Sequence, residues 1–486
     1  MRLRRIGVLS LASLVTGSLL NFLPATEAGA ISFDTDPSTG LAKTVTKDSC
    51  PTLTETPRYF EVFWNTDDME SRGYLDAKNN SPWSFANRIA QIICGAKARS
   101  HIYIGMYFVR AIGTSERPES DSEVIWKAME YVHKYRKVSI GMVMDKGSIT
   151  PASAKKLIRK RLKGIASLYW CSKGCFNTNT YNGLTNPTNP TWDEDLQKYL
   201  TISDVSINHE KFMVMTNTRW EKDGKTHPLV YSSSGQFARS QFRGYTQEAS
   251  VIYDDKQMAK LFTDRYMNMK TCATSASKCR AGKFSATAYK KDTLVKQRGI
   301  WVDSVYKHPT DAGRGTTVSF SPQPQKASEF YIQQFGNVDC SVDNKIRVAM
   351  YRLTDSRAVQ FVRQMVRLKR AGCDVQVLLS QQGGAQTISK EVARLFKKAN
   401  MTSRIRCTAL PTHTKLVLIT PADSSAGRVL FGTSNMTTWG LRYSEEHTIT
   451  IDSRKATGQY AEDIKRVVAQ YEAGWNELSL GSKVCK

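Results

Sequence analysis

The spacing of apolar residues along this chain predicts strands and helices in regular alternation. Short apolar runs bounded by polar turns are typical of β-strands. Such runs occupy 62–65, 101–107 and 138–144, and again 318–321, 345–351 and 375–379. Apolar residues three and four apart predict amphipathic helices at 124–132, 155–162, 258–269, 359–366, 390–399 and 460–475. The alternation favours an α/β fold in which helices cover both faces of a sheet.

The order of these elements repeats once along the chain. The stretch His101-Ile-Tyr-Ile-Gly-Met-Tyr107 parallels Lys345-Ile-Arg-Val-Ala-Met-Tyr351, and the elements before and after them also correspond. A stretch with many charged and small residues and little apolar periodicity separates the two copies. We therefore expect a first half at 31–270, a connecting segment at 271–317 and a second half at 318–486.

Each half contains the same polar motif at the start of an apolar strand. The pattern His-x-Lys, four apolar residues and Thr occurs at His209–Thr216 and at His413–Thr420. A second strand follows each copy and ends in an amide, 27 residues beyond the first histidine at Gln236 and 22 residues beyond the second at Asn435. Residues two apart on a strand share a face, so His and Lys project together from each motif.

A duplicated His, Lys and amide set suits the chemistry of phosphodiesters. One histidine can attack phosphorus while the other protonates the leaving oxygen, and lysines with amides can hold the charge that builds on the equatorial oxygens. A lone histidine on a strand is more often structural. That interpretation applies to the five histidines outside the motifs: His101, His133, His227, His308 and His447.

These motifs resemble those of the phospholipase D superfamily, over roughly residues 58 to 476. The signature of that superfamily is His-x-Lys-x4-Asp followed by Gly-Ser-x-Asn. Here Thr216 and Thr420 stand in the aspartate position, and the second element reads Ser233-Ser234-Gly235-Gln236 in the first half and Gly432-Thr433-Ser434-Asn435 in the second. The tyrosyl-DNA phosphodiesterases of the same superfamily also dispense with that aspartate, so its loss is compatible with phosphodiester chemistry.

The resemblance implies a fold and a two-step mechanism. The fold would be two α-β-α sandwich halves packed about a pseudo-twofold axis, with both histidines in one cleft. His209 would attack phosphorus, and His413 would protonate the leaving alcohol and then activate water. The other residues with an implied role at the site are Lys211, Lys415, Gln236 and Asn435 as main donors, Ser234 and Thr433 as lesser donors, and Glu248 and Glu446 as carboxylates that orient the histidines.

The resemblance implies no metal or other cofactor, because the cationic side chains already supply a positive field. It implies no stable protein partner either. Since one chain holds both halves, a monomer is sufficient for a complete site.

The amino-terminus reads as a signal peptide. Arg2, Arg4 and Arg5 precede the apolar run 6–20, and Ala28-Gly29-Ala30 has the form of a signal-peptidase site. We expect residues 1–30 to be removed and the protein to be secreted. A retained membrane anchor is the alternative, although the run is shorter than the roughly 20 residues that a membrane span needs.

The ten cysteines all follow this segment, and an even count in an exported chain favours disulfides. We expect the close pairs Cys171 with Cys175 and Cys272 with Cys279 to form local bridges. Zinc binding is the alternative, but no second pair at zinc-finger spacing accompanies them.

Charge indicates an anionic partner without identifying it. The net charge is +25, and removal of residues 1–30, with three arginines and one glutamate, leaves +23. Such an excess favours anionic lipid surfaces or nucleic acid. Three functions stay open: a lipid-degrading phospholipase D, with Tyr169-Trp170 and the stretch 436–439 as apolar loops that enter a bilayer; a nuclease on DNA or RNA; and a binding-only descendant.

Overall fold

The protein is described by a computed structural model. The described residues are 50, 59–65, 85–109, 120–146, 152–172, 174–176, 191–193, 198–200, 207–219, 225–238, 241–242, 245–275, 308–309, 313–321, 330–354, 356–381, 387–437, 440–441 and 444–485. The expected signal peptide and most of the expected connecting segment, 271–317, lie outside them, and these boundaries stay predictions.

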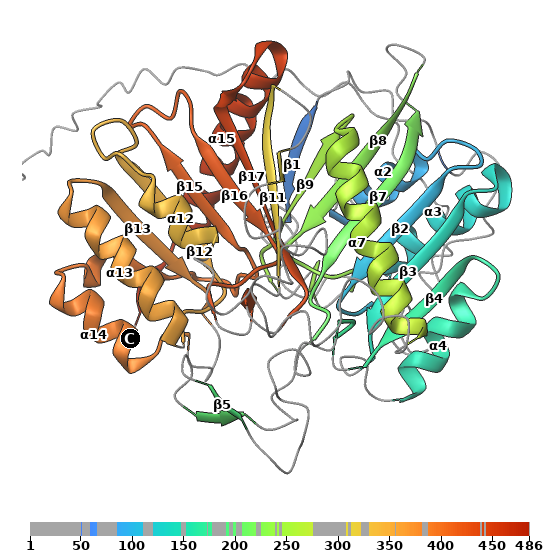
Figure 1. The fold of residues 1–486 in the computed structure, drawn as a ribbon, viewed down its shortest axis with the longest axis horizontal. Coiled ribbons are helices and arrows are strands. Elements are labelled where there is room, and N and C mark those ends of the chain that lie inside the picture. Colours follow the sequence, from blue (N-terminus) through green and yellow to red (C-terminus); the bar gives the residue numbers. More distant parts are fainter. Residues whose placement is uncertain are drawn as a thin grey trace, which may run out of the picture.

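Two mixed β-sheets form the framework of the molecule, one from each half of the chain (Figure 1). The first has the order β1-β9-β8-β7-β2-β3-β4. Its strands are β1 (Phe60–Trp64), β2 (His101–Met106), β3 (Ser139–Asp145), β4 (Ala166–Cys171), β7 (Lys211–Arg219), β8 (Thr226–Ser233) and β9 (Glu248–Tyr253). Strands β2, β3 and β4 run parallel, and the other neighbours pair antiparallel.

The second sheet repeats this order and adds a strand at each edge. Its order is β10-β11-β17-β16-β15-β12-β13-β14-β18. The strands are β10 (His308–Pro309), β11 (Arg314–Ser321), β12 (Lys345–Met350), β13 (Asp374–Leu379), β14 (Ile405–Cys407), β15 (Leu416–Thr420), β16 (Arg428–Gly432), β17 (Glu446–Ala456) and β18 (Lys483–Val484). A separate small hairpin consists of β5 (Thr191–Asp193) and β6 (Lys198–Leu200). The duplication seen in the sequence is therefore a duplication of topology.

Helices cover both faces of each sheet. Those on the first sheet are α2 (Phe85–Cys94), α3 (Ser120–Arg136) and α4 (Ala152–Leu162), with α7 (Lys256–Thr274) on the inner face. Those of the second half are α12 (Phe330–Gly336), α13 (Ser356–Arg370) and α14 (Lys390–Lys398), with α15 (Gly458–Ser479) on the inner face and a short 3-10 turn at Thr402–Arg404. The expected fold, two α-β-α halves, is confirmed.

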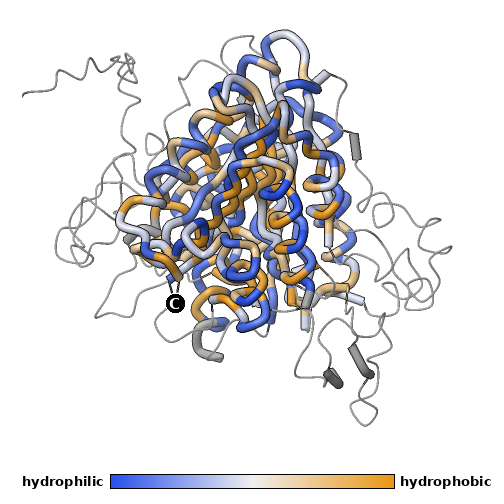
Figure 2. Tube along the Cα trace, turned by 90° about the vertical axis from the view of Figure 1, so that its left-hand side faces the viewer, coloured by the Kyte–Doolittle hydropathy of each residue, from blue (hydrophilic) through white to orange (hydrophobic). Residues whose placement is uncertain are grey.

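A shared central core joins the halves. Apolar side chains of both sheets, such as Phe212 and Val318, pack with α7 and α15 into one buried cluster. Each sheet has a second cluster under its outer helices. Figure 2 shows the hydrophobic segments gathered through the middle of the molecule. Burial of this much apolar surface between the halves fixes their relative position.

Polar contacts reinforce the same junction. Asp463 of α15 accepts hydrogen bonds from the backbone N–H groups of Tyr59 and Phe60, at 2.6 and 2.9 Å. Arg466, one turn further along α15, donates to the carbonyl of Phe60 at 2.6 Å. The last helix of the chain therefore satisfies the free edge of the first strand, β1.

Every strand and helix predicted from the apolar pattern is present. The structure also contains elements that were not predicted, among them α2 and α12. Helix α12 has seven residues, too few to establish a period. Helix α2 does carry helical spacing, at Phe85, Ile89 and Ile92, so the signal for it was available. Tyr169 and Trp170 lie in β4, at the edge of the first sheet, and pack against two different cores. They therefore do not form an apolar loop beside the site, as the lipid interpretation supposed.

Disulfides account for the cysteines of the described chain. Cys171 pairs with Cys175, as predicted, and the other bridges are Cys50–Cys94, Cys340–Cys373 and Cys407–Cys485. Cys272 is also disulfide-bonded. Cys279 lies outside the described residues, so that pairing stays a prediction.

Removal of the Cys407–Cys485 bridge should destabilise the protein by about 4 kcal/mol, because it closes a loop of 78 residues. The double change Cys407→Ser, Cys485→Ser should therefore lower the denaturant midpoint clearly. The same change at Cys171 and Cys175, which are 4 residues apart, should cost about 2 kcal/mol. Equal midpoint shifts for the two variants would contradict this loop-length argument.

Candidate active site

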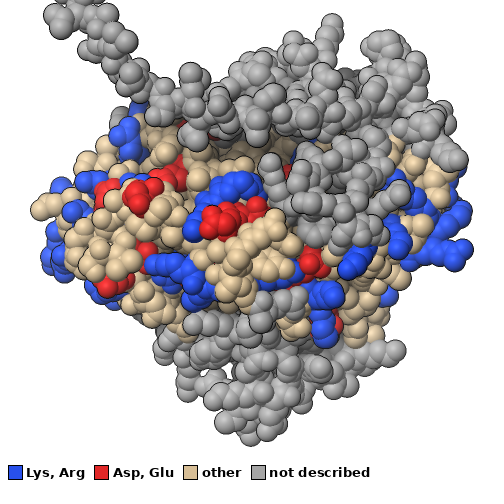
Figure 3. Space-filling view, turned by 90° about the horizontal axis from the view of Figure 1, so that it is seen from above, with Lys and Arg blue, Asp and Glu red and all other residues tan. Residues whose placement is uncertain are grey.

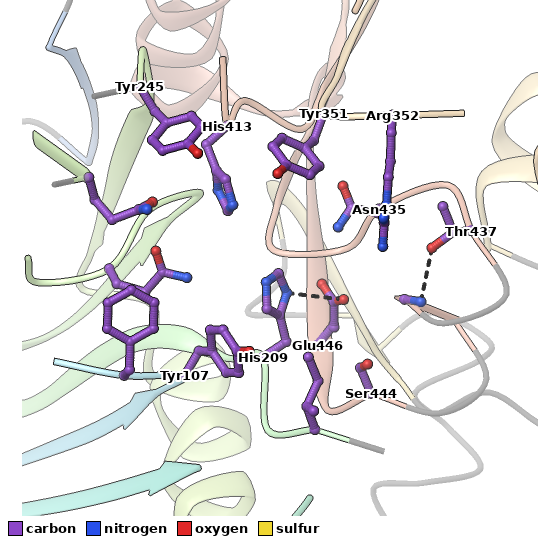
Figure 4. A pocket seen from close by; sticks show the side chains of 15 residues that line it. Tyr107, His209, Tyr245, Tyr351, Arg352, His413, Asn435, Thr437, Ser444 and Glu446 are labelled. Atoms are coloured by element: carbon purple, nitrogen blue, oxygen red, sulfur yellow. Dashed lines mark hydrogen bonds and ion pairs between the residues drawn. The ribbon is translucent and has the colours of Figure 1, made fainter. Parts of the chain in front are cut away.

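The two histidine motifs meet at the boundary between the halves. Strand β7 begins two residues after His209, and β15 begins three residues after His413. The apolar residues that follow are fully buried in the cores. This anchoring leaves the polar start of each strand at the sheet edge. The two imidazole rings lie 6.2 Å apart, centre to centre, and face one pocket (Figure 4).

Backbone hydrogen bonds between the halves hold the two motifs in place. The N–H of His209 donates to the carbonyl of Glu445 at 3.0 Å, and the N–H of His413 donates to that of Thr246 at 2.8 Å. The backbone N–H groups of Glu445 and Thr246 in turn donate to the carbonyls of Ile207 and Pro411, respectively. Each histidine is thus positioned by the half that it does not belong to.

The pocket has a volume of about 310 Å³, at the lower end of the range for small-molecule sites. Both halves line it, with predicted site residues and others: Tyr107, Phe108, Ile207, His209, Gln236, Gln241, Tyr245, Tyr351, Arg352, His413, Asn435, Thr437, Gly440, Ser444 and Glu446.

The motif lysines are buried below the histidines. Lys211 Nζ donates to the carbonyl of His209 at 2.7 Å, and Lys415 Nζ donates to that of His413 at 2.6 Å. Lys415 Nζ also lies 3.0 Å from His413 Nδ1. The amides Gln236 and Asn435 each keep a buried side-chain oxygen without a hydrogen-bond partner in the described part of the chain. Polar groups in this state are suited to bind a ligand.

The two predicted carboxylates occupy different places. Glu446 Oε1 lies 3.1 Å from His209 Nδ1, across the boundary between the halves. Glu248 instead accepts from Ser234 Oγ at 2.9 Å and from the backbone N–H of Lys415 at 3.4 Å. Among the described residues, the structure therefore pairs Glu446 with a histidine and places Glu248 behind the second motif.

Strand register explains this difference. Ser233 pairs with Ala249 in the first sheet, and Gly432 pairs with Thr448 at the same place in the second. Gln247 stands two residues before Ala249, and Glu446 stands two residues before Thr448. The residue of the first half that corresponds to Glu446 is therefore Gln247, an amide. His413 Nδ1 lies 2.5 Å from the carbonyl of Ser234 instead. The two histidines thus have unequal partners.

Burial dominates the electrostatics of the site. It lowers the pKa of His209 and of His413 well below the usual value, and the nearby lysines lower both further. It also lowers the pKa of Lys211 strongly and that of Lys415 to about 7. The pKa of Glu446 rises well above its usual value for the same reason. The imidazole of His209 is therefore neutral near pH 7, as a nucleophile requires, and a bound phosphate would favour protonated lysines and a protonated His413.

The threonines in the aspartate position lie far from the pocket. Thr216 is five residues beyond Lys211 on β7, about 17 Å at the rise of a strand, and its Oγ1 accepts from the N–H of His101 at 3.0 Å. Thr420 ends β15 at the corresponding place. The departure from the family signature therefore does not alter the reacting groups.

The hydroxyls of Ser234 and Thr433 are engaged elsewhere. Ser234 donates to Glu248, and Thr433 Oγ1 accepts from the N–H of His447 at 2.9 Å. Neither residue lines the pocket in the described structure. Their expected part as lesser donors to the substrate stays a prediction.

His447 belongs to a buried network that joins the halves. Its Nδ1 lies 2.5 Å from Glu210, the middle residue of the first motif, and its Nε2 lies 2.7 Å from Ser232 Oγ. Glu210 also forms an ion pair with Arg265 of α7 at 2.9 Å. Burial alone would raise the pKa of Glu210, but Arg265 and His447 outweigh it and lower that pKa. The geometry is that of a structural network.

Several pocket residues were not predicted from the sequence. Tyr107 and Tyr351 pack against His209 and His413 respectively, each with ring centres 5.1 Å apart. Their recurrence at the end of both repeated strands was a signal that could have identified them. Arg352 and Tyr245 carry no such signal, because neither recurs in the other half.

The described residues contain neither a candidate membrane span nor a candidate metal cluster. No helix there is both long and apolar enough to cross a bilayer. No group of three or more His, Cys, Asp or Glu side chains there is arranged to hold a metal ion.

Comparisons with known proteins agree with the motifs. Residues 340–468 match the family model described as cardiolipin synthase, phospholipase D-like domain. No curated protein matches the chain by sequence. The solved phosphatidylserine synthase of Haemophilus influenzae is similar in fold, with a TM-score of 0.53 at 12% identity over 90% of this chain and 89% of that one.

Two further solved structures have lower scores. The polyphosphate kinase of Porphyromonas gingivalis has a TM-score of 0.44 at 9% identity, over 85% of this chain and 47% of that one. A yeast tyrosyl-DNA phosphodiesterase has a TM-score of 0.43 at 9% identity, over 77% and 88%. The family match therefore identifies a phospholipase D-like domain in the second half, and the likeness to the phosphatidylserine synthase shows that most of the chain has the fold of that enzyme.

Proposed function

We propose that this protein is an exported phospholipase D that hydrolyses glycerophospholipids to phosphatidic acid and a free headgroup. The observation that carries the proposal is the pair of histidines, 6.2 Å apart, that face one pocket above two buried lysines. This arrangement supplies a nucleophile, an acid and a positive field for one phosphodiester group.

In the first step, His209 Nε2 attacks phosphorus and forms a P–N bond. The P–O bond to the headgroup breaks, and His413 gives a proton to the leaving oxygen. We assign the nucleophile to His209 because Glu446 lies at its Nδ1 and can stabilise the positive charge of the phosphohistidine. His413 has the carbonyl of Ser234 and Lys415 Nζ at its Nδ1, and no carboxylate of the described residues is recorded there, so it lacks that support and serves as the acid.

In the second step, His413 takes a proton from water, and the water oxygen attacks phosphorus. The P–N bond breaks, and His209 leaves as a neutral imidazole. The proton on His413 is the one that it gives up in the next cycle, so the enzyme returns to its initial state. Lys211, Lys415, Gln236 and Asn435 hold the equatorial oxygens in both steps.

A phospholipid substrate is favoured by the matched family, which is named for cardiolipin synthase. A nuclease is the second candidate, because a net charge of +25 suits a polyanion. On the face seen in Figure 3, Lys and Arg lie in several separate groups over the described surface, and Asp and Glu stand between some of them. The described residues of this face therefore do not form one continuous track for a nucleic-acid strand.

Export is supported by the disulfides. Four complete bridges lie within the described residues, and such bridges persist in oxidising compartments. The amino-terminal arginines and apolar run point in the same direction.

The mature protein should release choline or glycerol from mixed phosphatidylcholine and phosphatidylglycerol vesicles, and excess EDTA should leave the rate within about twofold. The reason is that buried lysines supply the positive charge that a metal ion would otherwise provide. Headgroup release with and without EDTA measures this. Single- and double-stranded DNA are assayed beside the vesicles, and cleavage of DNA without headgroup release would replace the lipid proposal by the nuclease.

A further inference from the structure

We infer that Arg352 forms a subsite for a second anionic group of the substrate, beside the scissile phosphate. The inference deepens the proposed function and rests on it. Arg352 lies immediately after β12 and lines the pocket next to Asn435 and Thr437 (Figure 4). Its side chain is exposed, so a ligand can reach it.

The subsite belongs to one side of the pocket. Strands β2 and β12 correspond, and each is followed by a tyrosine, Tyr107 or Tyr351. The next residue is Phe108 in the first half and Arg352 in the second, and both line the pocket. Tyr245 on the first side likewise stands where the second has Ser444. At two corresponding places the first half therefore supplies an aromatic side chain to the pocket, where the second half supplies Arg352 and Ser444.

Arg352 lies close enough to the reacting groups to serve the same substrate. It lines the pocket with Asn435, one of the amides that hold the equatorial oxygens in the proposed mechanism. The guanidinium is thus placed to meet a second anionic group of the bound substrate, beside the scissile phosphate.

Arg352 has the charge available for such a contact. Among the described residues, no carboxylate lies within ion-pair distance of it, and its recorded neighbour is the ring of Tyr351, 6.0 Å away. Its charge nevertheless reaches the reacting groups, because it helps to lower the pKa of His209 and of Lys415. A planar guanidinium that faces a pocket without a partner suits a carboxylate or a phosphate.

The test compares two soluble ligands that differ only by a carboxylate. O-phosphoserine and phosphoethanolamine share the phosphate and the amine, so calorimetry with both isolates the extra anion. We expect phosphoserine to bind about tenfold more tightly, and Arg352→Met to remove that preference, since a hydrogen-bonded charge contact is worth about this much. Arg352→Lys should keep part of it. The melting temperature of each variant reports its folding.

Equal binding of the two ligands by the intact protein would overturn the inference, as would a preference that Arg352→Met leaves unchanged. Thymidine 3',5'-bisphosphate is titrated as well, and tighter binding of it than of phosphoserine would assign the second anion to nucleic acid instead.

Turnover is measured separately, with short-chain phosphatidylserine and phosphatidylethanolamine below their micelle concentrations. Absence of any turnover would count against the proposed function alone, since the binding comparison needs no catalysis.

Discussion

Replacement of His209 by alanine should lower kcat by at least about 10⁴-fold on every phosphodiester that the protein cleaves. The catalytic groups act as a unit, so loss of the nucleophile removes most of the rate enhancement. The alanine variant should also show no burst of p-nitrophenol from a p-nitrophenyl phosphodiester. His413→Asn should retain that burst, because p-nitrophenol leaves without an acid, and should then stall as a covalent adduct on His209. Rapid mixing followed by mass spectrometry measures both results.

His227→Ala is the matched control for His209→Ala. His227 also has a carboxylate at its Nδ1, with Asp254 at 2.7 Å, but it lies outside the pocket. Its replacement should leave kcat within a few-fold. An adduct on His413, or a burst from His209→Ala, would reverse the assignment of nucleophile and acid.

Replacement of Lys415 by methionine should lower kcat/KM by about 10² to 10³-fold at pH 6, the usual cost of one group that stabilises the developing charge. It should also change the pH profile. Burial lowers the pKa of Lys415 to about 7, so the free enzyme carries this charge below pH 7 and loses it above. In the intact protein, kcat/KM should therefore fall as the pH rises through about 7.

The same linkage predicts a difference between two kinetic parameters. A bound phosphate favours the protonated lysine, so the alkaline limb of kcat should lie at higher pH than that of kcat/KM. On the acid side, activity should persist well below pH 6.5, because His209 stays neutral there. Lys415→Met should lack the limb near pH 7. A limb that survives this change would have to come from His413 or Lys211, and the role given to Lys415 would be wrong.

The sequence was sufficient to predict the fold and the centre of the site, because duplication provides an internal comparison. The apolar run after each His-x-Lys fixed the strand, and period two fixed the face on which both side chains project. The comparison of the two halves also contained the signal that distinguishes the position of Glu446 from that of Glu248. Glu446 lies 11 residues beyond its amide and Glu248 lies 12, and that one-residue shift reverses the side of a strand to which a residue points.

Other features had no local signal. Arg352 faces the pocket because β12 ends there beside β15, the strand of the second histidine motif, and both conditions are tertiary. The partner of His209 belongs to the other half, 237 positions away along the chain, and no pattern within one half indicates such a contact. The buried network of Glu210, Arg265 and His447 depends in the same way on how the halves pack.

The backbone bonds from His209 to Glu445 and from His413 to Thr246 affect when activity first appears during synthesis. A ribosome that has completed β9 has already made His209, Lys211 and Gln236. The segment that positions this histidine, and the carboxylate beside it, begin 236 residues later, at Glu445. A chain that stops before β17 should therefore be inert towards lipids, and the nascent protein should stay harmless to the membranes it passes until β17 has folded.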